Sequence, residues 1–230
     1  MTTFIALPDL HDHPESLKTI ARPLMQADVV LLVGDMTNGG INHLLRLLTI
    51  LTDLNEHIYT VPGNMDTVKM LAHLAREDYN IHRRFEWVDG LALVGLGGAL
   101  PFVGKFVFNE EELAQLLDDA IAELNADVPT ILVSHQPPYD CKLDLLPNGV
   151  HVGSKSVRSW IEQHQPLICV CGHIHEAVGI DQIGNTILIN PGPLWVTGNY
   201  AYFEIVNGQV VMAEIRQAPM QPPKDTEDVG

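Results

Sequence analysis

The chain has little positive charge and no long apolar run. It carries 13 Lys and Arg against 29 Asp and Glu, a formal net charge of −16 over 230 residues. An acidic surface repels nucleic-acid phosphates and anionic lipids, so we expect neither nucleic acid nor membrane as a partner unless a bound cation intervenes. No apolar run approaches the roughly 20 residues that cross a bilayer as a helix. The sequence therefore predicts no membrane span.

Cysteine is scarce as well. The three cysteines, Cys141, Cys169 and Cys171, cannot all pair within one chain, which is typical of a reducing compartment. The N-terminal residues MTTFIALPDLHDH lack the basic start and the small-residue cleavage site of a signal peptide. We therefore expect a cytoplasmic protein. We interpret Cys169 and Cys171 as small apolar residues of a buried strand rather than as metal thiolates.

The composition is that of a globular chain with a substantial core, because 46% of the residues are hydrophobic and 18% are charged. The length suits one α/β domain, which we predict over residues 1–216. Residues 217–230, QAPMQPPKDTEDVG, are polar, contain proline and show no periodicity. We predict a loose C-terminal tail there.

Short apolar runs alternate with helical patterns along most of the chain. We predict strands at FIALP, DVVLLVG, HIYTV, LALVGL, PTILVS, PLICVCG, TILIN, YAYFEIV and QVVMAEI. The clearest helix covers residues 109–125, with Asn109 as N-cap, Glu112 three residues later and a leucine-rich stripe. Turn dipeptides at 184–185 and 207–208 predict two hairpins. The pattern favours two packed sheets with helices outside.

Metal-binding residue types follow five of these apolar runs. The segments are PDLH at 8–11, GDMTN at 34–38, PGNMD at 62–66, SHQPP at 134–138 and GHIH at 172–175. Because ligands of open α/β sheets bind beyond the carboxyl ends of the strands, we expect these segments to converge. The seven candidate ligands are Asp9, His11, Asp35, Asn64, His135, His173 and His175. Seven donors are too many for one tetrahedral ion and suit two ions that share a bridge.

The residue types and spacing restrict the metal. Imidazole and carboxylate together suit Zn, Mn, Fe or Ni, and the segments contain no thiolate for a structural zinc site. In Asp9-Leu-His11 and His173-Ile-His175 the i, i+2 spacing on an extended segment projects both side chains to one side, so each pair can hold one metal centre. An alternative ligand pair, His11 and His13 instead of Asp9 and His11, stays open, although the position directly after the strand favours Asp9 and His11. The remaining histidines, His43, His57, His73, His82 and His164, are interpreted as ordinary surface or core residues.

The five segments together resemble the motifs of the calcineurin-like metallophosphoesterases: DxH, GDxxD, GNH(D/E), a histidine after a strand, and GHxH. The match spans roughly residues 5–190, and the NPG at 190–192 is similar to a turn of small bacterial and archaeal members. The resemblance implies a four-layer α/β/β/α sandwich of two mixed sheets flanked by helices. It also implies a binuclear centre where the two sheets meet at their strand ends.

The resemblance further implies a role for each ligand. The first metal would be held by Asp9, His11, Asp35 and His175. Asp35 would bridge to the second metal, which would be completed by Asn64, His135 and His173. Two divalent ions of uncertain identity (Mn, Fe, Zn or Ni) would then bind a small phosphate ester, and a hydroxide that bridges them would attack the phosphorus.

Two positions depart from the family pattern. Met65 stands where the GNH element often has a histidine that protonates the leaving group, a contribution of about 10²- to 10⁴-fold. Unless His13, His151 or a water molecule replaces this acid, we expect phosphodiesters and aryl phosphates to be better substrates than alkyl phosphates. Asn38 stands where GDxxD expects aspartate and is a candidate substrate contact. Asn64 and Asp66 are the candidate catalytic residues, and Asp66 is expected to cap the helix that begins TVKMLAHLA.

Two further segments are candidates for substrate binding. Residues 153–156, GSKS, begin a predicted helix, so backbone amides and Lys155 could bind a phosphate there, although an ordinary serine cap explains the pattern equally well. His151 is the best additional imidazole. Residues 101–109, PFVGKFVFN, form an aromatic loop that either stacks an aryl group or base or covers the core.

The leading hypothesis is a metal-dependent phosphoesterase that hydrolyses a small phosphodiester or a nucleotide-like ester. The alternative is a catalytically weak or inactive interaction scaffold, because the family includes a retromer subunit of that kind; seven intact ligands favour the enzyme. A DNA-repair nuclease shares these motifs, but the net charge and Met65 oppose it. The sequence leaves a homodimer open.

Overall fold

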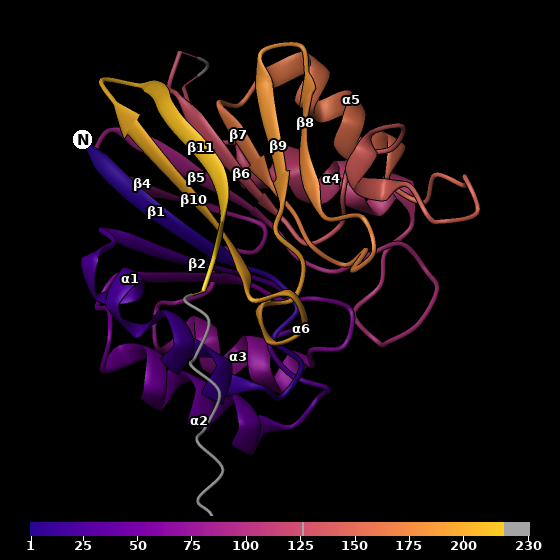
Figure 1. The fold of residues 1–230 in the computed structure, drawn as a ribbon. Coiled ribbons are helices and arrows are strands. Elements are labelled where there is room, and N and C mark those ends of the chain that lie inside the picture. The colour runs from indigo at the N-terminus through magenta and orange to yellow at the C-terminus, as the bar shows by residue number, and fades with distance from the viewer. Residues whose placement is uncertain (126, 219–230) are drawn as a thin grey trace, which may run out of the picture.

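A computed structural model describes residues 1–125 and 127–218 of the chain. Two β-sheets face each other, and helices cover their outer faces (Figure 1). The first sheet contains β1 (Thr2–Leu7), β2 (Val29–Val33), β3 (Ile58–Val61), β10 (Asn199–Val206) and β11 (Gln209–Gln217), in the order β11-β10-β1-β2-β3. Strands β1, β2 and β3 are parallel, whereas β10 and β11 are antiparallel to their neighbours.

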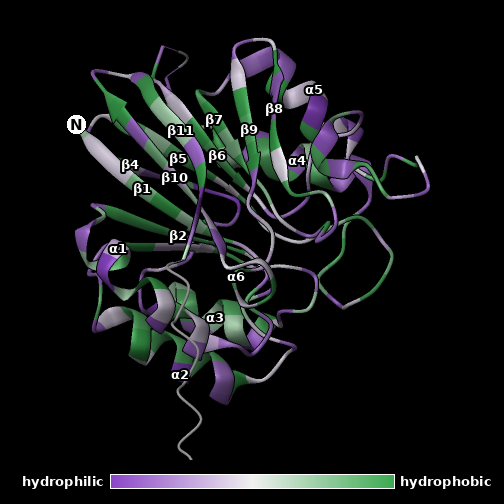
Figure 2. Ribbon diagram, in the orientation of Figure 1, coloured by the Kyte–Doolittle hydropathy of each residue, from purple (hydrophilic) through white to green (hydrophobic). Residues whose placement is uncertain are grey.

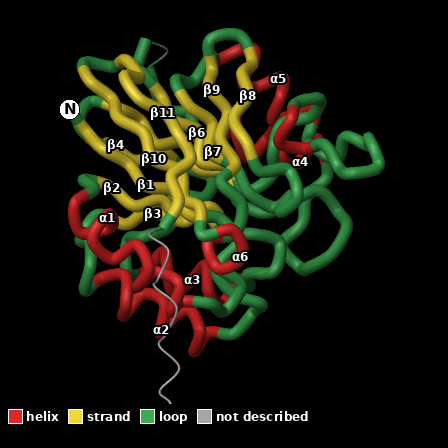
Figure 3. The backbone as a smooth tube through the Cα atoms, viewed as in Figure 1, coloured by secondary structure: helices red, strands yellow, loops and turns green. Residues whose placement is uncertain are grey.

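The second sheet has six strands. They are β4 (Phe85–Val88), β5 (Leu91–Leu96), β6 (Thr130–Ser134), β7 (Ile168–Val170), β8 (Gly179–Ile183) and β9 (Thr186–Asn190), in the order β4-β5-β6-β7-β9-β8. Its two edge strands are antiparallel and the inner strands are parallel. The prediction of a four-layer sandwich of two mixed sheets flanked by helices is confirmed (Figure 3).

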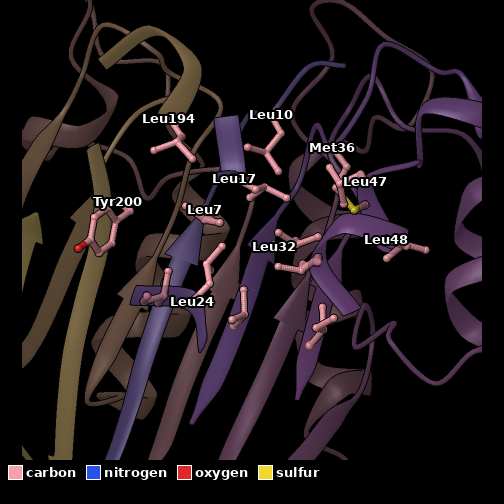
Figure 4. Close-up of a cluster of buried hydrophobic side chains, with 14 of the residues drawn as sticks. Leu7, Leu10, Leu17, Leu24, Leu32, Met36, Leu47, Leu48, Leu194 and Tyr200 are labelled. Atoms are coloured by element: carbon pink, nitrogen blue, oxygen red, sulfur yellow. The ribbon is translucent and has the colours of Figure 1, made fainter. Parts of the chain in front are cut away.

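Helices pack on the outer face of each sheet. The described helices are η1 (Pro14–Ile20), α1 (Ala21–Gln26), α2 (Ile41–Thr52), α3 (Val68–Arg76), α4 (Glu110–Ala120), η2 (Lys142–Asp144), α5 (Lys155–His164) and α6 (Leu194–Thr197). Leucines of η1, α1 and α2 cover the first sheet (Figure 4), and residues of α4 and α5 cover the second. Among the described residues, none of the helices has both the length and the apolar character needed to cross a bilayer.

Inner strands such as β1 and β2 are apolar and buried on both faces because each sheet lies between two layers. On β1, Phe4 and Ala6 point into the core between the sheets, while Ile5 and Leu7 point toward the helices. Phe4 stacks on Phe203 of β10 with ring centroids 4.8 Å apart. Figure 2 shows this pattern as hydrophobic strands between amphipathic helices. Burial on both sides therefore fixes how the strand ends are placed relative to one another.

Several local predictions are confirmed. Helix α4 begins after Asn109, whose side chain accepts from the Glu112 amide at 2.9 Å while the Glu112 side chain accepts from the Asn109 amide at 2.8 Å. The helix ends at Ala120, before the predicted residue 125. Both hairpins are present, as β8 with β9 and β10 with β11.

Two boundaries differ from the prediction. Strand β4 was not predicted, because FEWV is a short, partly exposed edge strand with no long apolar run. The tail was predicted to begin at residue 217, but Gln217 is the last residue of β11 and pairs with Asn199. Residues 219–230 of the predicted tail lie outside the described residues.

Candidate metal centre

The five polar segments begin at, or within two residues after, the ends of β1, β2, β3, β6 and β7, at the carboxyl ends of parallel strands. Six of the seven predicted ligands form two clusters there. The first cluster contains Asp9, His11 and His175, and the second contains Asp35, His135 and His173. Within each cluster the ligand atoms lie within 4.8 Å of one another. The predicted convergence of distant segments is therefore present in the structure.

Asp35 joins the two clusters into one centre. Its Oδ2 atom lies 3.6 Å from His11 Nε2 of the first cluster and 3.6 Å from His135 Nε2 of the second. Within the first cluster, His175 Nε2 lies 3.5 Å from Asp9 Oδ1 and 3.3 Å from His11 Nε2. A carboxylate between two sets of donors has the position that a bridging ligand needs.

Asn64, the seventh predicted ligand, extends the second cluster. Its Oδ1 atom lies 3.0 Å from His135 Nε2, and its Nδ2 atom donates to the Val103 carbonyl at 3.0 Å. Because Val103 takes the amide nitrogen, the amide oxygen is left to face the centre. The backbone thus selects the atom of Asn64 that suits a metal.

Fixed partners orient two of the imidazoles. His135 Nδ1 lies 2.9 Å from the Val33 carbonyl, and His11 Nδ1 lies 2.9 Å from Asn38 Oδ1. An oxygen partner holds the proton on Nδ1, which leaves Nε2 free to accept a metal. In both rings Nε2 is the atom that faces Asp35.

Four of the ligands have a left-handed backbone, namely Asp9 (φ 56°), His11 (φ 41°), Asp35 (φ 46°) and His173 (φ 67°). Such conformations cost about 1–3 kcal/mol each in non-glycine residues and concentrate at functional sites. The expectation that the i, i+2 pairs lie on extended segments is therefore wrong. A turn brings Asp9 and His11 into the same cluster, whereas His173 and His175 go to different clusters.

Gly34, between β2 and Asp35, lets the two sheets approach closely. It has φ +85°, and a Cβ atom there would lie 2.3 Å from His135 Nδ1. Any side chain at this position would displace the His135 imidazole, which lies beside Asp35 in the second cluster. The glycine of GDMTN is therefore needed to bring the segments after β2 and β6 together.

Burial shifts the protonation of this centre. It raises the pKa of Asp35, a rise that His135 reduces and Asp9 reinforces. Burial, and then the electrostatic effect of the neighbouring His135, lowers the pKa of His173 to about 3. A carboxylate that is costly to ionise and an imidazole that stays neutral both gain from a nearby cation. The donor set therefore fits divalent metal ions.

Asn38 supports a ligand. Besides its contact with His11, its Nδ2 atom donates to Asp12 Oδ2 at 3.0 Å, and its backbone amide donates to Asp12 Oδ1 at 3.3 Å. These bonds fix the Asn38 carboxamide against the imidazole. Asn38 therefore orients His11, and its predicted contact with substrate stays a proposal.

Asp66 connects two ligand segments. The prediction that it caps α3 is wrong, because Thr67 is the N-cap and its hydroxyl accepts from the Met70 amide. The Asp66 carboxylate instead accepts from the amides of Gly63 at 2.9 Å, Thr37 at 3.2 Å and Met36 at 3.3 Å. Burial, reinforced by the nearby charge of Asp35, raises its pKa to about 7.

The predicted anion site at the start of α5 is filled by the chain itself. The Glu110 carboxylate accepts from the Lys155 amide at 2.9 Å, the Ser156 amide at 3.0 Å and the Ser154 hydroxyl at 2.6 Å. The hypothesis that these amides bind a phosphate is therefore not supported, whereas the alternative of an ordinary serine cap is confirmed, because the Ser154 hydroxyl accepts from the Val157 amide at 3.1 Å. The Lys155 ammonium group lies 5.4 Å from the centroid of the Tyr139 ring.

His151 is engaged within its own loop. Its Nδ1 atom lies 2.7 Å from Asp144 Oδ1, and this hydrogen bond raises its pKa. Asp144 also accepts from the amides of Cys141 and Gly153 at 2.9 Å each. The histidine and the carboxylate together close the loop that precedes α5.

Trp195 supports the centre and was not predicted. Its indole Nε1 donates to the Asp9 carbonyl at 3.0 Å, and its ring stacks on His13 with centroids 4.1 Å apart. His13 is in neither cluster, so the alternative ligand frame is not supported. The tryptophan lies two residues after the NPGP turn of residues 190–193, which is the signal in the sequence that could have pointed to it.

Comparisons with known proteins agree with this geometry. A family model described as calcineurin-like phosphoesterase matches residues 2–177. An uncharacterized protein of Methanocaldococcus jannaschii is 39% identical over 174 residues, which cover 73% of this chain and 78% of that protein. The structure of TT1561 from Thermus thermophilus matches with a TM-score of 0.71 and 20% identity, covering 95% of this chain and 99% of its own.

A dimetal phosphatase from Danio rerio has a TM-score of 0.63 and 14% identity, with 95% of this chain and 99% of its own covered. These two solved structures share the fold. The family assignment comes from the family model, which covers most of the sandwich and all five polar segments. The chain belongs to the calcineurin-like phosphoesterases, a family of phosphate ester hydrolases that depend on two divalent metal ions.

Proposed function

We propose that this chain hydrolyses small phosphodiesters or nucleotide-like phosphate esters with two divalent ions. The observation that carries the proposal is the place of Asp35, 3.6 Å from a histidine of each cluster. Asp9, His11, Asp35 and His175 would hold one ion. Asp35, Asn64, His135 and His173 would hold the other.

The residues around the centre would hold the metal ligands in position. When bound, a pair of divalent ions activates water at neutral pH and neutralises phosphate charge. The Val33 carbonyl, Asn38 and the Val103 carbonyl each fix one ligand in a single orientation. Asp66 joins the segments after β2 and β3, and we assign it a positioning role. Preorganised ligands of this kind need no rearrangement during the reaction.

The preference for acidic leaving groups rests on Met65. Its backbone amide donates to Asp35 Oδ1 at 2.8 Å, which places the residue beside the centre, but its thioether has no proton to donate. Two other imidazoles could replace this acid, but neither His151, which is bonded to Asp144, nor His13, which is stacked on Trp195, belongs to either ligand cluster. Without a general acid, the leaving group must depart as a stable anion.

The test uses metal-reconstituted protein and three substrates: bis-p-nitrophenyl phosphate, p-nitrophenyl phosphate and an alkyl phosphate. We expect turnover to fall in that order, and we expect Asp35→Ala to abolish it. Equal turnover of the aryl and alkyl esters would contradict the leaving-group argument. Metal-loaded protein that cleaves none of a broad phosphoester panel would favour the interaction scaffold instead.

A further inference from the structure

A loop beside the second cluster is bound directly to one of the predicted metal ligands. Residues 100–107, here called the 100–107 loop, lie between β5 and α4. The amides of Lys105 and Phe106 donate to the Asn64 carbonyl at 2.9 and 3.3 Å, and the Asn64 side chain donates to the Val103 carbonyl at 3.0 Å. The loop therefore holds Asn64 through both its main chain and its side chain.

Both ends of the 100–107 loop are anchored. The Leu100 amide donates to Oε1 of buried Gln136, which follows His135, at 2.9 Å. At the other end Phe106 packs edge-on against His82 with ring centroids 5.3 Å apart. These anchors fix the place of the loop tip relative to the metal centre.

Gly104 allows the loop to contact Asn64 so closely. It has φ +91°, and a Cβ atom there would lie 2.1 Å from the Asn64 carbonyl oxygen. A side chain at this position would push the loop away from the ligand. The close approach therefore depends on glycine.

Phe102 takes no part in the core. It is 91% exposed, more than any other large hydrophobic residue in the described ranges, and it immediately precedes Val103. Since consecutive Cα atoms are about 3.8 Å apart, its backbone lies next to the carbonyl that Asn64 binds. Lys105, on the other side of Gly104, is exposed as well. The loop thus carries an exposed aromatic ring and an exposed cation next to residues that contact the predicted ligand Asn64.

We propose that Phe102 determines specificity by stacking against the aromatic part of the substrate, an aryl group or a nucleobase. The inference rests on the proposed function, in which the centre takes the phosphate. An exposed aromatic ring contributes little to folding, and an aromatic substrate gives it a partner of matching chemistry. The anionic ester also suits the neighbouring Lys105.

The test measures binding of two ligands that are not hydrolysed, phenylphosphonate and methylphosphonate, to metal-reconstituted protein by calorimetry. We expect Phe102→Ala to weaken phenylphosphonate about threefold to tenfold and to leave methylphosphonate unchanged. Phe102→Tyr should restore the affinity for phenylphosphonate relative to methylphosphonate. Trp87→Ala is the matched control, because Trp87 is a 54% exposed aromatic residue on β4.

An unchanged ratio of the two affinities in Phe102→Ala would overturn the inference. An equal loss for both ligands would also overturn it, because the loop would then act only through Asn64. Thermal unfolding of each variant identifies folding defects. Turnover of bis-p-nitrophenyl phosphate by the unmodified chain is measured in parallel. Its absence contradicts the proposed function, whereas turnover with an unchanged affinity ratio contradicts only the role of Phe102.

Discussion

The two ligand clusters of the centre are held in different ways. In the second cluster the His135 side chain is 0% exposed, and main-chain carbonyls of Val33 and Val103 fix the ligands. In the first cluster the His175 side chain is 37% exposed, and His11 is fixed by another side chain, that of Asn38. Main-chain support is part of the fold, whereas side-chain support can be changed by one substitution. We therefore expect the second cluster to bind its ion more tightly and the first to exchange more readily.

The largest effect is expected from Asp35→Ala, which removes the residue that the two clusters share. Both ions should bind more weakly, and activity should fall by more than about 100-fold, the upper range for residues that only orient ligands. Metal content and turnover check this outcome. Asp53→Ala, an exposed acid after α2, is the control. Retention of both ions by Asp35→Ala would mean that the clusters are independent.

Single-cluster variants should separate the two sites. His135→Ala should lose the second ion and His175→Ala the first, and each variant should keep one ion. His135→Ala should also lower the free energy of unfolding by about 1–3 kcal/mol, because it removes the hydrogen bond of the imidazole to the buried Val33 carbonyl. Metal titration and denaturant unfolding measure both effects. The contrast between the clusters fails if His175→Ala destabilises the protein as much.

Asn38→Ala tests the side-chain support of the first cluster. Loss of the Asn38 contact frees the His11 ring, so affinity for the first ion should fall by about 10-fold while the second ion is unaffected. Asn38→Asp keeps an oxygen for His11 Nδ1 but loses the Nδ2 donor to Asp12, so it should recover only part of the lost affinity. Competition titration with a metal chelator measures both variants. An equal loss of affinity for both ions would contradict the claim that Asn38 supports only the first cluster.

The residues of the centre could be predicted from the sequence, but their geometry could not. Apolar runs followed by Asp, Asn or His indicated where parallel strands end, and strand ends meet because the sheets are packed. The left-handed backbone of Asp35 and the clamp between Asn64 and Val103 depend on contacts between distant segments. Neither leaves a pattern in the local sequence. Edge strand β4 was missed because it is only partly buried.

The start of α5 shows the same limit. Its sequence resembles an anion site, but Glu110, which lies 45 residues before Lys155, supplies the anion from within the chain. A helix N-terminus attracts negative charge whether it belongs to a ligand or to another part of the protein. The residue types therefore indicated a capped helix start that attracts negative charge, but not that Glu110 supplies this charge.

The smallest effect is expected at this helix. Glu110→Ala should lower the free energy of unfolding by about 1 kcal/mol and leave metal binding unchanged. Burial alone would raise the pKa of Glu110, but hydrogen bonds from Ser154, Ser156 and Lys155 lower it overall. The stabilisation is thus present above the usual glutamate pKa and is lost as the pH falls through the lowered value. Denaturant unfolding at neutral and acidic pH measures this stabilisation, with Glu111→Ala as control. A difference in the free energy of unfolding between Glu110→Ala and the unmodified chain that grows in acid would contradict it.

The most direct test of the central claim is the number of ions bound by the reconstituted chain. The two clusters joined by Asp35 predict two divalent ions per chain, measured by elemental analysis after removal of excess metal. The same measurement on Asp35→Ala should show that both ions are weakened together. Less than one ion per chain in the unmodified protein would contradict a binuclear centre.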